Sequence, residues 1–343
     1  MQALVHTAPN RFEMRDVPIP VIGGKDVLVR VQAVGICGSD VHGMTGKTGR
    51  RKPPVIMGHE AAGIIEKTGS DVTSFKPGDR VTFDSTIYCG VCAFCRSGRV
   101  NLCDNRRVLG VSCDEYRQDG AMAEYVAVPE HILYRLPETM SFEEGAMIEA
   151  LSIGVHAVER TLLAKGDTVV IVGCGIIGLM TLQAARAKGA GTIIAVDLDA
   201  NKLSLAKKFG ASVLIDPSKT DVVKAVFDAT GGKGADAAFE AVGITQTVAT
   251  AVKSVRKGGE VTLVGNLAPE VTFPLQSVVT REIRVNGSCA SAGEYPRCLE
   301  LIATGNVDVK TLISKTVPLA EGERWFNVLL ENKEPLFKVV LKP

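Results

Sequence analysis

The feature that most constrains the fold is a regular alternation of short apolar segments and longer amphipathic segments between Lys165 and Val285. The apolar segments predict strands at 168–173, 192–197, 212–216, 235–243 and 260–266. The segments between them predict helices at 174–189, 200–211, 220–231 and 245–259, several of which end at a glycine. Strands that alternate with helices form right-handed βαβ units, so this region predicts an α/β fold with a doubly wound parallel sheet.

The chain before this region has a different character, because short segments rich in branched residues replace the helical pattern. Residues 27–36, 61–69 and 121–129 predict strands, and 77–81 predicts a turn followed by a strand. No long helical period occurs in roughly the first 145 residues, so we expect an all-β segment there. After the alternation, 295–305 predicts a helix and 335–343 a final strand. A length of 343 residues fits about two domains.

Composition and charge exclude several classes of protein. Hydrophobic residues make up 46% of the chain and charged residues 22%, which is enough for a full core. The 39 basic and 38 acidic residues give a net charge of +1, without the basic excess that nucleic acid or a membrane surface requires. The first residues resemble neither a signal peptide nor a transit peptide, so we expect a cytoplasmic protein. Residues 168–185 are uncharged and long enough to span a membrane, but the three glycines among them favour a cofactor motif.

That motif is the sequence Gly-Cys-Gly-Ile-Ile-Gly at 173–178, which follows a predicted strand and opens a predicted helix. Such glycines allow a tight turn, a close approach of the backbone to a pyrophosphate, and close packing of the helix on the strand. The next predicted strand ends in Asp197, 24 residues after Gly173, where a ribose-binding acid is expected. The alternative is that Asp197 only caps the helix that begins near Ala200. The motif predicts dinucleotide binding, with the cofactor-binding residues Gly173, Gly175, Ile177 and Gly178.

Four of the nine cysteines are clustered at Cys89, Cys92, Cys95 and Cys103, with the spacing C-x2-C-x2-C-x7-C. In a chain without a secretory signal, this clustering favours metal binding over disulfides. Four thiolates can close a tetrahedron around Zn²⁺ and leave no open position, which predicts a structural zinc. An iron–sulfur cluster and four free buried thiols are the alternatives.

A second, dispersed set of possible metal ligands consists of Cys37, the pair His59 and Glu60, and Glu149. A thiolate, an imidazole and carboxylates form a mixed ligand set that can leave a position for water or substrate. The spacing alone does not join these residues. His59 can equally be a hydrogen-bonded core histidine, and Cys37 a buried apolar side chain.

These segments resemble the zinc-dependent medium-chain dehydrogenases/reductases over essentially the whole chain. The segment GHEAAGIIEKTGSDV (58–72) fits the zinc alcohol dehydrogenase signature. The segment EEGAMIEALSIGVHA (143–157) resembles the sorbitol (polyol) dehydrogenase branch, with Glu149 where ordinary alcohol dehydrogenases carry a cysteine. The resemblance implies a GroES-like β-barrel catalytic domain (1–148 and 287–343) with a structural-zinc lobe at about 86–106. A Rossmann dinucleotide-binding domain (149–286) is then inserted between its two parts.

The resemblance also implies a role for each matching residue. Cys37, His59 and Glu60 resemble the catalytic zinc ligands, and Glu149 would bind the metal or hydrogen-bond its water. Ser39 and His42 resemble a proton relay in which the serine takes the alcohol proton and the cofactor ribose and His42 pass it to solvent. Asp197 and Lys202 would hold the adenosine ribose of NAD. The stretches that would meet the nicotinamide are Val264, Gly265 and Asn266, and Ser288, Cys289 and Ala290. Two zinc ions per chain are therefore expected, one catalytic and one structural.

The expected activity is reversible hydride transfer from a secondary alcohol of a polyol or sugar derivative to NAD, with a ketone as product. Animal sorbitol dehydrogenases carry an aromatic residue at the position of Gly43, and an arginine and a tyrosine at those of Ala290 and Ser291. The resemblance thus supports the polyol branch rather than sorbitol itself. The alternatives are a 2,3-butanediol or L-threonine 3-dehydrogenase activity and, more remotely, a non-enzymatic binding protein on the same fold. A homotetramer or homodimer is expected.

Overall fold

The computed structural model describes residues 1–112 and 116–343. The chain divides into two compact units. The first consists of Met1–Glu149, Tyr295–Leu299 and Val309–Pro343, and the second of Ala150–Glu294 and Glu300–Asp308. The chain passes between the units within α4 (Ile148–Glu159), immediately before and within α10 (Tyr295–Ala303), and again between Asp308 and Val309.

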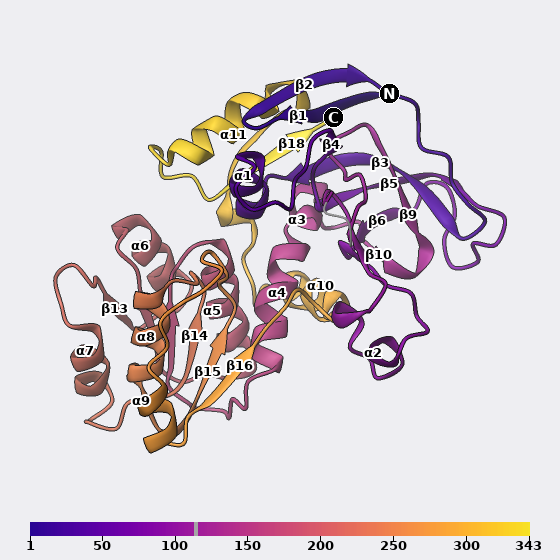
Figure 1. Ribbon diagram of the computed structural model, residues 1–343. Coiled ribbons are helices and arrows are strands. Elements are labelled where there is room, and N and C mark those ends of the chain that lie inside the picture. Colours follow the sequence, from indigo (N-terminus) through magenta and orange to yellow (C-terminus); the bar gives the residue numbers. More distant parts are fainter. Residues whose placement is uncertain (113–115) are drawn as a thin grey trace. The chain divides into compact units, whose positions relative to one another are not determined.

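The second unit is built on a six-stranded parallel sheet with the strand order β13-β12-β11-β14-β15-β16 (Figure 1). Its strands are β11 (Val169–Val172), β12 (Ile193–Val196), β13 (Val213–Ile215), β14 (Ala235–Glu240), β15 (Val255–Leu263) and β16 (Arg284–Gly287). The helices that connect them are α5 (Ile176–Lys188), α6 (Ala200–Lys208), α7 (Val222–Ala229), α8 (Thr245–Ser254) and α9 (Leu275–Thr280). This order is that of the dinucleotide-binding doubly wound fold, and it confirms the predicted parallel sheet.

Local sequence explains most of these elements. Every residue of β11 and β12 is buried, as expected for central strands of a sheet covered on both faces. Asp199 and Asp221 cap the N-termini of α6 and α7 through their side chains, and Gly189 ends α5 in the left-handed conformation. The predicted helix 245–259 was too long, because α8 ends at Ser254 and β15 begins at Val255. Val255 is fully buried and pairs with Ala235 of β14, so tertiary packing overrides the helical pattern there.

The first unit is a β structure whose largest sheet has the order β10-β6-β5-β3-β18-β17, with β9 also paired to β3. The strands of this sheet are β3 (Asp26–Gly35), β5 (Glu60–Thr68), β6 (Arg80–Phe83), β9 (Tyr125–Pro129), β10 (Leu133–Arg135), β17 (Ile313–Pro318) and β18 (Lys338–Lys342). A three-stranded sheet contains β1 (Gln2–Ala8), β2 (Arg11–Asp16) and β4 (Val55–Ile56), and a small one contains β7 (Thr86–Ile87) and β8 (Arg107–Val108). The predicted final strand is thus found as β18. Only the second half of the predicted strand 121–129 is extended, as β9.

Short helices connect the strands of the first unit. They are α1 (Gly38–Met44), α2 (Ala93–Arg96), α3 (Phe142–Ala146) and α11 (Gly322–Glu331), with 3-10 turns η1 (Val100–Leu102), η2 (Glu130–Ile132), η3 (Lys310–Leu312) and η4 (Leu319–Glu321). In the described residues none of these helices exceeds 10 residues, in line with the absence of a long helical period before residue 145.

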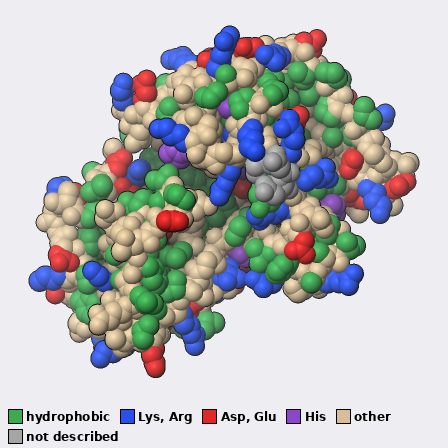
Figure 2. All heavy atoms as spheres, in the orientation of Figure 1, with side chains coloured by type: hydrophobic (Ala, Val, Ile, Leu, Met, Phe, Trp, Pro, Cys, Tyr) green, Lys and Arg blue, Asp and Glu red, His purple; other side chains and the backbone are tan. Residues whose placement is uncertain are grey.

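The surface of the second unit includes an apolar face on α9, next in sequence to the edge strand β16. Leu275 and Val279 of α9 are 64% and 65% exposed, and Figure 2 shows hydrophobic side chains over this part of the unit. Among the described residues, no helix combines the length and the apolar character that crossing a bilayer requires. The uncharged stretch 168–185 instead forms β11, the glycine turn and most of α5.

Candidate active site

Two adjacent strands of the first unit bring the first group of predicted metal ligands together. β3 and β5 are antiparallel, and Gly35 at the end of β3 pairs with Glu60 at the start of β5. Cys37 follows this end of β3 and His59 precedes β5, so the three side chains meet. One ligand atom from each of Cys37, His59 and Glu60 lies within 4.8 Å of the others. A thiolate, an imidazole and a carboxylate at this spacing are a donor set that Zn²⁺ accepts.

A buried carboxylate lies beside the imidazole of His59. Its Nδ1 lies 3.3 Å from Oδ2 of Asp40, and Asp40 is fully buried. Burial opposes a charge on the imidazole, but the negative charges of Asp40 and Cys37 outweigh burial and raise the pKa of His59 well above its usual value. A site that attracts a proton this strongly also attracts a metal cation, which would compete with that proton. A carboxylate behind a ligating histidine is a common way to orient the ring.

Asp40 is in turn fixed by Arg51, a residue to which the sequence alone assigns no role. Nε and Nη2 of Arg51 donate to Oδ1 of Asp40 at 3.0 and 2.8 Å, and Nη2 also donates to Oγ of Ser39 at 3.4 Å. Burial opposes the charge of Asp40, but His59 and Arg51 together lower the pKa of its carboxyl group. A Cβ atom at Gly43 would lie 2.4 Å from Cγ of Arg51, so this arginine occupies the space that an aromatic residue would need.

Glu60 is paired with Lys338 of β18, a second residue to which the sequence alone assigns no role. Nζ of Lys338 donates to both carboxylate oxygens of Glu60, at 2.8 and 2.5 Å, and to the carbonyl of Ile36 at 3.2 Å. The side chains are 2% and 1% exposed. Burial opposes the charge of Lys338, but Glu60 and Cys37 outweigh burial and raise its pKa. Glu60 is therefore a metal-ligand candidate that already has a buried counter-ion.

Glu149 lies outside the group of Cys37, His59 and Glu60 whose ligand atoms are mutually close in the described chain. It is the second residue of α4, is 7% exposed, and accepts a hydrogen bond from Oγ of Ser85 at 3.4 Å. Burial raises the pKa of Glu149 to about 7, and the negative charges of Glu60 and Asp84 contribute. The structure thus places Glu149 within electrostatic reach of the group, and its role as a ligand stays a prediction.

The two residues of the predicted proton relay lie on α1. Ser39 is exposed and its hydroxyl donates to Sγ of Cys37 at 3.3 Å. His42 is exposed and follows Ser39 by three residues, which places both on the same side of the helix. The relay itself is a prediction that these positions permit.

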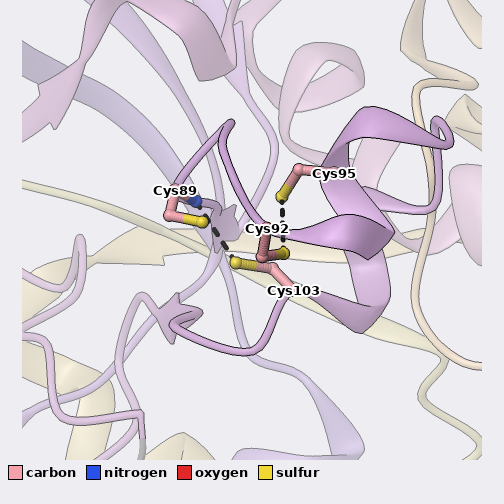
Figure 3. A group of neighbouring side chains, drawn as sticks. All are labelled: Cys89, Cys92, Cys95 and Cys103. Carbon is pink, nitrogen blue, oxygen red and sulfur yellow. Dashed lines mark hydrogen bonds between the residues drawn. The ribbon is translucent and has the colours of Figure 1, made fainter.

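The four clustered cysteines converge in a small lobe formed by α2, η1 and the loops around them (Figure 3). One sulfur from each of Cys89, Cys92, Cys95 and Cys103 lies within 4.8 Å of the others, and Sγ of Cys92 is 3.5 Å from Sγ of Cys95. None of the eight described cysteines forms a disulfide.

The pKa values of these thiols differ from one another. Backbone N–H groups of Val91 and Cys92 lower the pKa of Cys89 to about 6, whereas desolvation and Cys92 raise that of Cys95 to about 12. The thiols therefore do not all ionise near neutral pH without a cation among them, and a bound Zn²⁺ supplies the charge that deprotonates a coordinating thiol. Four sulfur ligands leave no open position, so this site fits a structural metal.

In the second unit, the predicted cofactor residues gather at the carboxyl edge of the parallel sheet. The glycine turn follows β11, Asp197 follows β12, and the stretches 264–266 and 288–290 follow β15 and β16. Gly175 begins α5 without a capping side chain, and no heavy atom lies within 4 Å of where its Cβ would be. A Cβ at Gly178 would lie 1.8 Å from the carbonyl oxygen of Gly173, so the third position of the motif has no room for a side chain. Free amides at the N-terminus of a 13-residue helix, with open space before them, fit a pyrophosphate.

Asp197 is anchored by two backbone amides. Its Oδ2 accepts the N–H of Cys174 at 2.7 Å and its Oδ1 accepts that of Asp199 at 2.9 Å. The carboxylate thus links the glycine turn to the start of α6, which also carries Lys202. The helix cap is Asp199 rather than Asp197, so the capping alternative for Asp197 is wrong.

The fold and these donor groups are typical of zinc-dependent dehydrogenases. Residues 23–138 match the alcohol dehydrogenase GroES-like domain, and residues 177–304 match the zinc-binding dehydrogenase domain. The chain therefore belongs to the zinc-binding alcohol dehydrogenase family. The predicted fold class, a GroES-like domain with a Rossmann-type parallel sheet, is confirmed.

Relatives in this family are similar over nearly the whole chain. Sorbitol dehydrogenase of Bacillus subtilis (strain 168) is 37% identical over 100% of this chain and 97% of its own. L-idonate 5-dehydrogenase of Vitis vinifera is 41% identical over 86% of this chain and 82% of its own. A solved structure of a zinc-binding dehydrogenase from Sinorhizobium meliloti 1021 bound to NADP is 36% identical, with a TM-score of 0.91, and covers 100% of this chain and 99% of that one. The resemblance to the polyol branch is confirmed by these relatives.

Proposed function

We propose that the protein is a zinc-dependent dehydrogenase that oxidises a secondary alcohol of a polyol or sugar derivative with NAD, giving a ketone. The observation that carries this proposal is the convergence of Cys37, His59 and Glu60 within 4.8 Å of one another in a family of zinc-binding dehydrogenases. Two named relatives, a sorbitol dehydrogenase and an L-idonate 5-dehydrogenase, support a polyhydroxylated substrate. We assign the metal sites to the first unit and the dinucleotide site, including the stretch 288–290, to the second unit.

We assign a separate role in the reaction to each residue of the site. Cys37, His59 and a carboxylate of Glu60 or Glu149 would hold a zinc ion, which would polarise the alcohol oxygen as a Lewis acid, and bound NAD would accept the hydride. Asp40 orients the imidazole of His59. The hydroxyl of Ser39 accepts the alcohol proton, and His42 passes it to solvent, to which it is exposed. We assign the second zinc to Cys89, Cys92, Cys95 and Cys103, with a structural role.

The cofactor preference rests on Asp197. Its carboxylate would accept the two hydroxyl groups of the adenosine ribose in NAD, whereas the extra phosphate of NADP would meet it with like charge. Both oxygens of Asp197 hold backbone amides, so the carboxylate cannot turn away from such a phosphate. The next residue is Leu198 rather than an arginine, which leaves Lys202 as the only nearby cation of the motif. Repulsion and lost hydrogen bonds together favour NAD by about 3 to 5 kcal/mol.

We also propose that the protein forms a homo-oligomer. A second copy can cover the exposed apolar face of α9 and the edge of β16 that no strand of the described residues pairs with. Sedimentation of the purified protein distinguishes a dimer from a tetramer, and a monomer would refute this part of the proposal.

The activity is tested by NADH absorbance with a panel of polyols, sugar alcohols and sugar acids, extended to a vicinal diol and to L-threonine. We expect turnover of polyhydroxylated secondary alcohols, loss of turnover after zinc chelation, and recovery on adding zinc back. Faster oxidation of the diol or of threonine would favour the alternative activity. A zinc-loaded protein that binds NADH but oxidises no alcohol and reduces no ketose would instead be a binding protein.

A further inference from the structure

A buried carboxylate in the centre of the parallel sheet belongs neither to the metal ligands nor to the residues assigned to the cofactor. Glu240 is the last residue of β14, which lies between β11 and β15, and it is fully buried. Among the described residues, no lysine, arginine or histidine forms an ion pair with it. Burial of a carboxylate is unfavourable unless its oxygens accept hydrogen bonds, so its local contacts must account for its position.

Glu240 accepts hydrogen bonds from four backbone amides. Its Oε1 accepts the N–H groups of Val242 and Gly243 at 2.9 and 2.8 Å. Its main-chain carbonyl accepts those of Val264 and Gly265 at 2.8 and 3.0 Å. The first two amides belong to the turn after β14, and the other two belong to the stretch after β15 that is assigned to the nicotinamide. The main-chain carbonyl thus joins β14 to the strand end of β15, and the carboxylate adds the bonds that hold the turn after β14.

The turn that the carboxylate holds lies between the glycine turn after β11 and the stretch after β15, which are both assigned to the cofactor. A Cβ at Gly173 would lie 2.4 Å from Cγ2 of Val242. A Cβ at Gly265 would lie 2.3 Å from the backbone of Val242 and 2.4 Å from the nitrogen of Gly243. The side chain of Val242 thus packs closely against the glycine turn after β11, and the backbone at 242–243 packs closely against the stretch after β15. A shift of this turn would change both contacts.

We propose that Glu240 is a positioning residue for the dinucleotide. By holding the amides of Val242 and Gly243, its carboxylate fixes the separation between the turn at Gly173 and the stretch Val264–Asn266. It does so from inside the sheet, without touching the cofactor. The two hydrogen bonds suit this task because a single oxygen, Oε1, accepts both N–H groups of the turn at 2.9 and 2.8 Å. This proposal rests on the assignment of the second unit as the NAD site.

The chain offers a matched control in the neighbouring strand. Glu260 of β15 is also buried, and its carboxylate also accepts two hydrogen bonds, from the N–H of Leu162 at 3.1 Å and from Nδ2 of Asn286. It lies three residues before the end of β15 and contacts none of the cofactor stretches in these bonds. A variant of Glu260 therefore also loses a buried carboxylate and its two hydrogen bonds, but it leaves the turn at 242–243 untouched.

The experiment compares Glu240→Ala, Glu240→Gln and Glu260→Ala by fluorescence titration with NADH and by competition with AMP, which lacks the nicotinamide. We expect Glu240→Ala to raise the Kd for NADH by about tenfold or more, as the loss of hydrogen bonds to a charged group implies. Its affinity for AMP should fall much less, because AMP lacks the nicotinamide and does not depend on the stretch Val264–Asn266. Glu240→Gln should restore most of the NADH affinity, since its amide oxygen can accept the same two N–H groups. Glu260→Ala should lower the melting temperature and leave the Kd for NADH unchanged.

Each outcome bears on one proposal. Wild-type protein that does not bind NADH would refute the NAD site itself. Wild-type protein that binds NADH, together with Glu240→Ala that binds it equally well, would overturn the role of Glu240 alone. If Glu240→Ala and Glu260→Ala weakened NADH binding equally, Glu240 would have only a structural role. The same would follow if Glu240→Ala weakened the binding of AMP and of NADH equally. If Glu240→Ala does not fold, Glu240→Asp, which keeps the charge but shortens its reach, should show the same selective loss of NADH affinity.

Discussion

Replacement of Arg51 tests how the metal site is supported. The variant Arg51→Met keeps the aliphatic stem that packs over Gly43 and removes the guanidinium. The Arg51 side chain is 4% exposed, and its Nε and Nη2 donate to the carboxylate of Asp40, which is 0% exposed. Removal of one partner from a buried ion pair leaves the other charge uncompensated, which costs about 3 to 5 kcal/mol in the free energy of unfolding. For a unit of this size, that loss corresponds to a fall in Tm of roughly 6 to 20 °C.

The same variant should weaken metal binding and change the acid stability. Asp40 orients His59, and loss of a group behind a ligand typically lowers metal affinity about 10- to 100-fold. Arg51 helps to lower the pKa of Asp40, so the ionised carboxylate contributes stability that is lost as the pH falls through that pKa. Without Arg51 the pKa of Asp40 rises. Acid unfolding of Arg51→Met should therefore begin at a higher pH than that of the wild type.

The assay is urea unfolding followed by the fluorescence of Trp325, the single tryptophan, which lies in the first unit. Zinc content is measured on the same samples. The control is Arg15→Met, whose partner Glu13 is 2.8 Å away but whose ion pair lies at the surface, so no measurable change is expected. If Arg51→Met were as stable as Arg15→Met and retained its zinc, the buried pair would not support the site and this reasoning would be wrong.

Other variants test separate parts of the site. Wild-type protein should use NAD several hundred-fold more efficiently than NADP, because the two cofactors differ by about 3 to 5 kcal/mol. Asp197→Ala should narrow the ratio of the two kcat/KM values, mainly by weakening the use of NAD. Equal or better use of NADP by the wild type would refute the role assigned to Asp197. His42→Ala should lower turnover by about ten- to several hundred-fold while keeping both metals, and loss of zinc would mean that His42 is a ligand. Elemental analysis should find about two zinc ions per chain. Cys95→Ser should lose one and become less stable or assemble poorly, whereas Cys37→Ser should lose turnover with its fold intact. Iron with acid-labile sulfide, or loss of activity with an intact fold in both cysteine variants, would contradict the division into structural and catalytic sites.

The parts of the fold that the sequence predicts are those set by neighbouring residues. The strands β11 and β12 are uninterrupted apolar segments, and the glycine turn between β11 and α5 has its signal within six residues. The cysteine lobe is equally local, because three of its four sulfurs lie within seven residues of one another. The boundary between α8 and β15 was missed because Val255 fits a helix and a strand alike, and its pairing with Ala235 decides between them.

The residues that the sequence does not reveal are charged groups whose partners are distant in the chain. Arg51 meets Asp40 across 11 residues, and Lys338 meets Glu60 across 278. Glu240 bonds amides of a turn and of a neighbouring strand end, which have no side-chain signature. A lysine at the start of the apolar segment VVL was the available signal for Lys338, since such a side chain is rarely fully buried without a partner.

The separation of Glu60 and Lys338 has a consequence for the biosynthesis of the protein. The ribosome adds about 5 to 20 residues per second, so the 278 residues between them take roughly 14 to 56 s to synthesise. During that interval the strands of the second unit emerge and can pair, whereas Glu60 has no ammonium group to neutralise it and β3 lacks its neighbour β18. We expect the nascent metal-binding half to stay open and dependent on chaperones until β18 arrives. Cys37 and His59 are translated early, yet we expect their site to be completed among the last steps of folding.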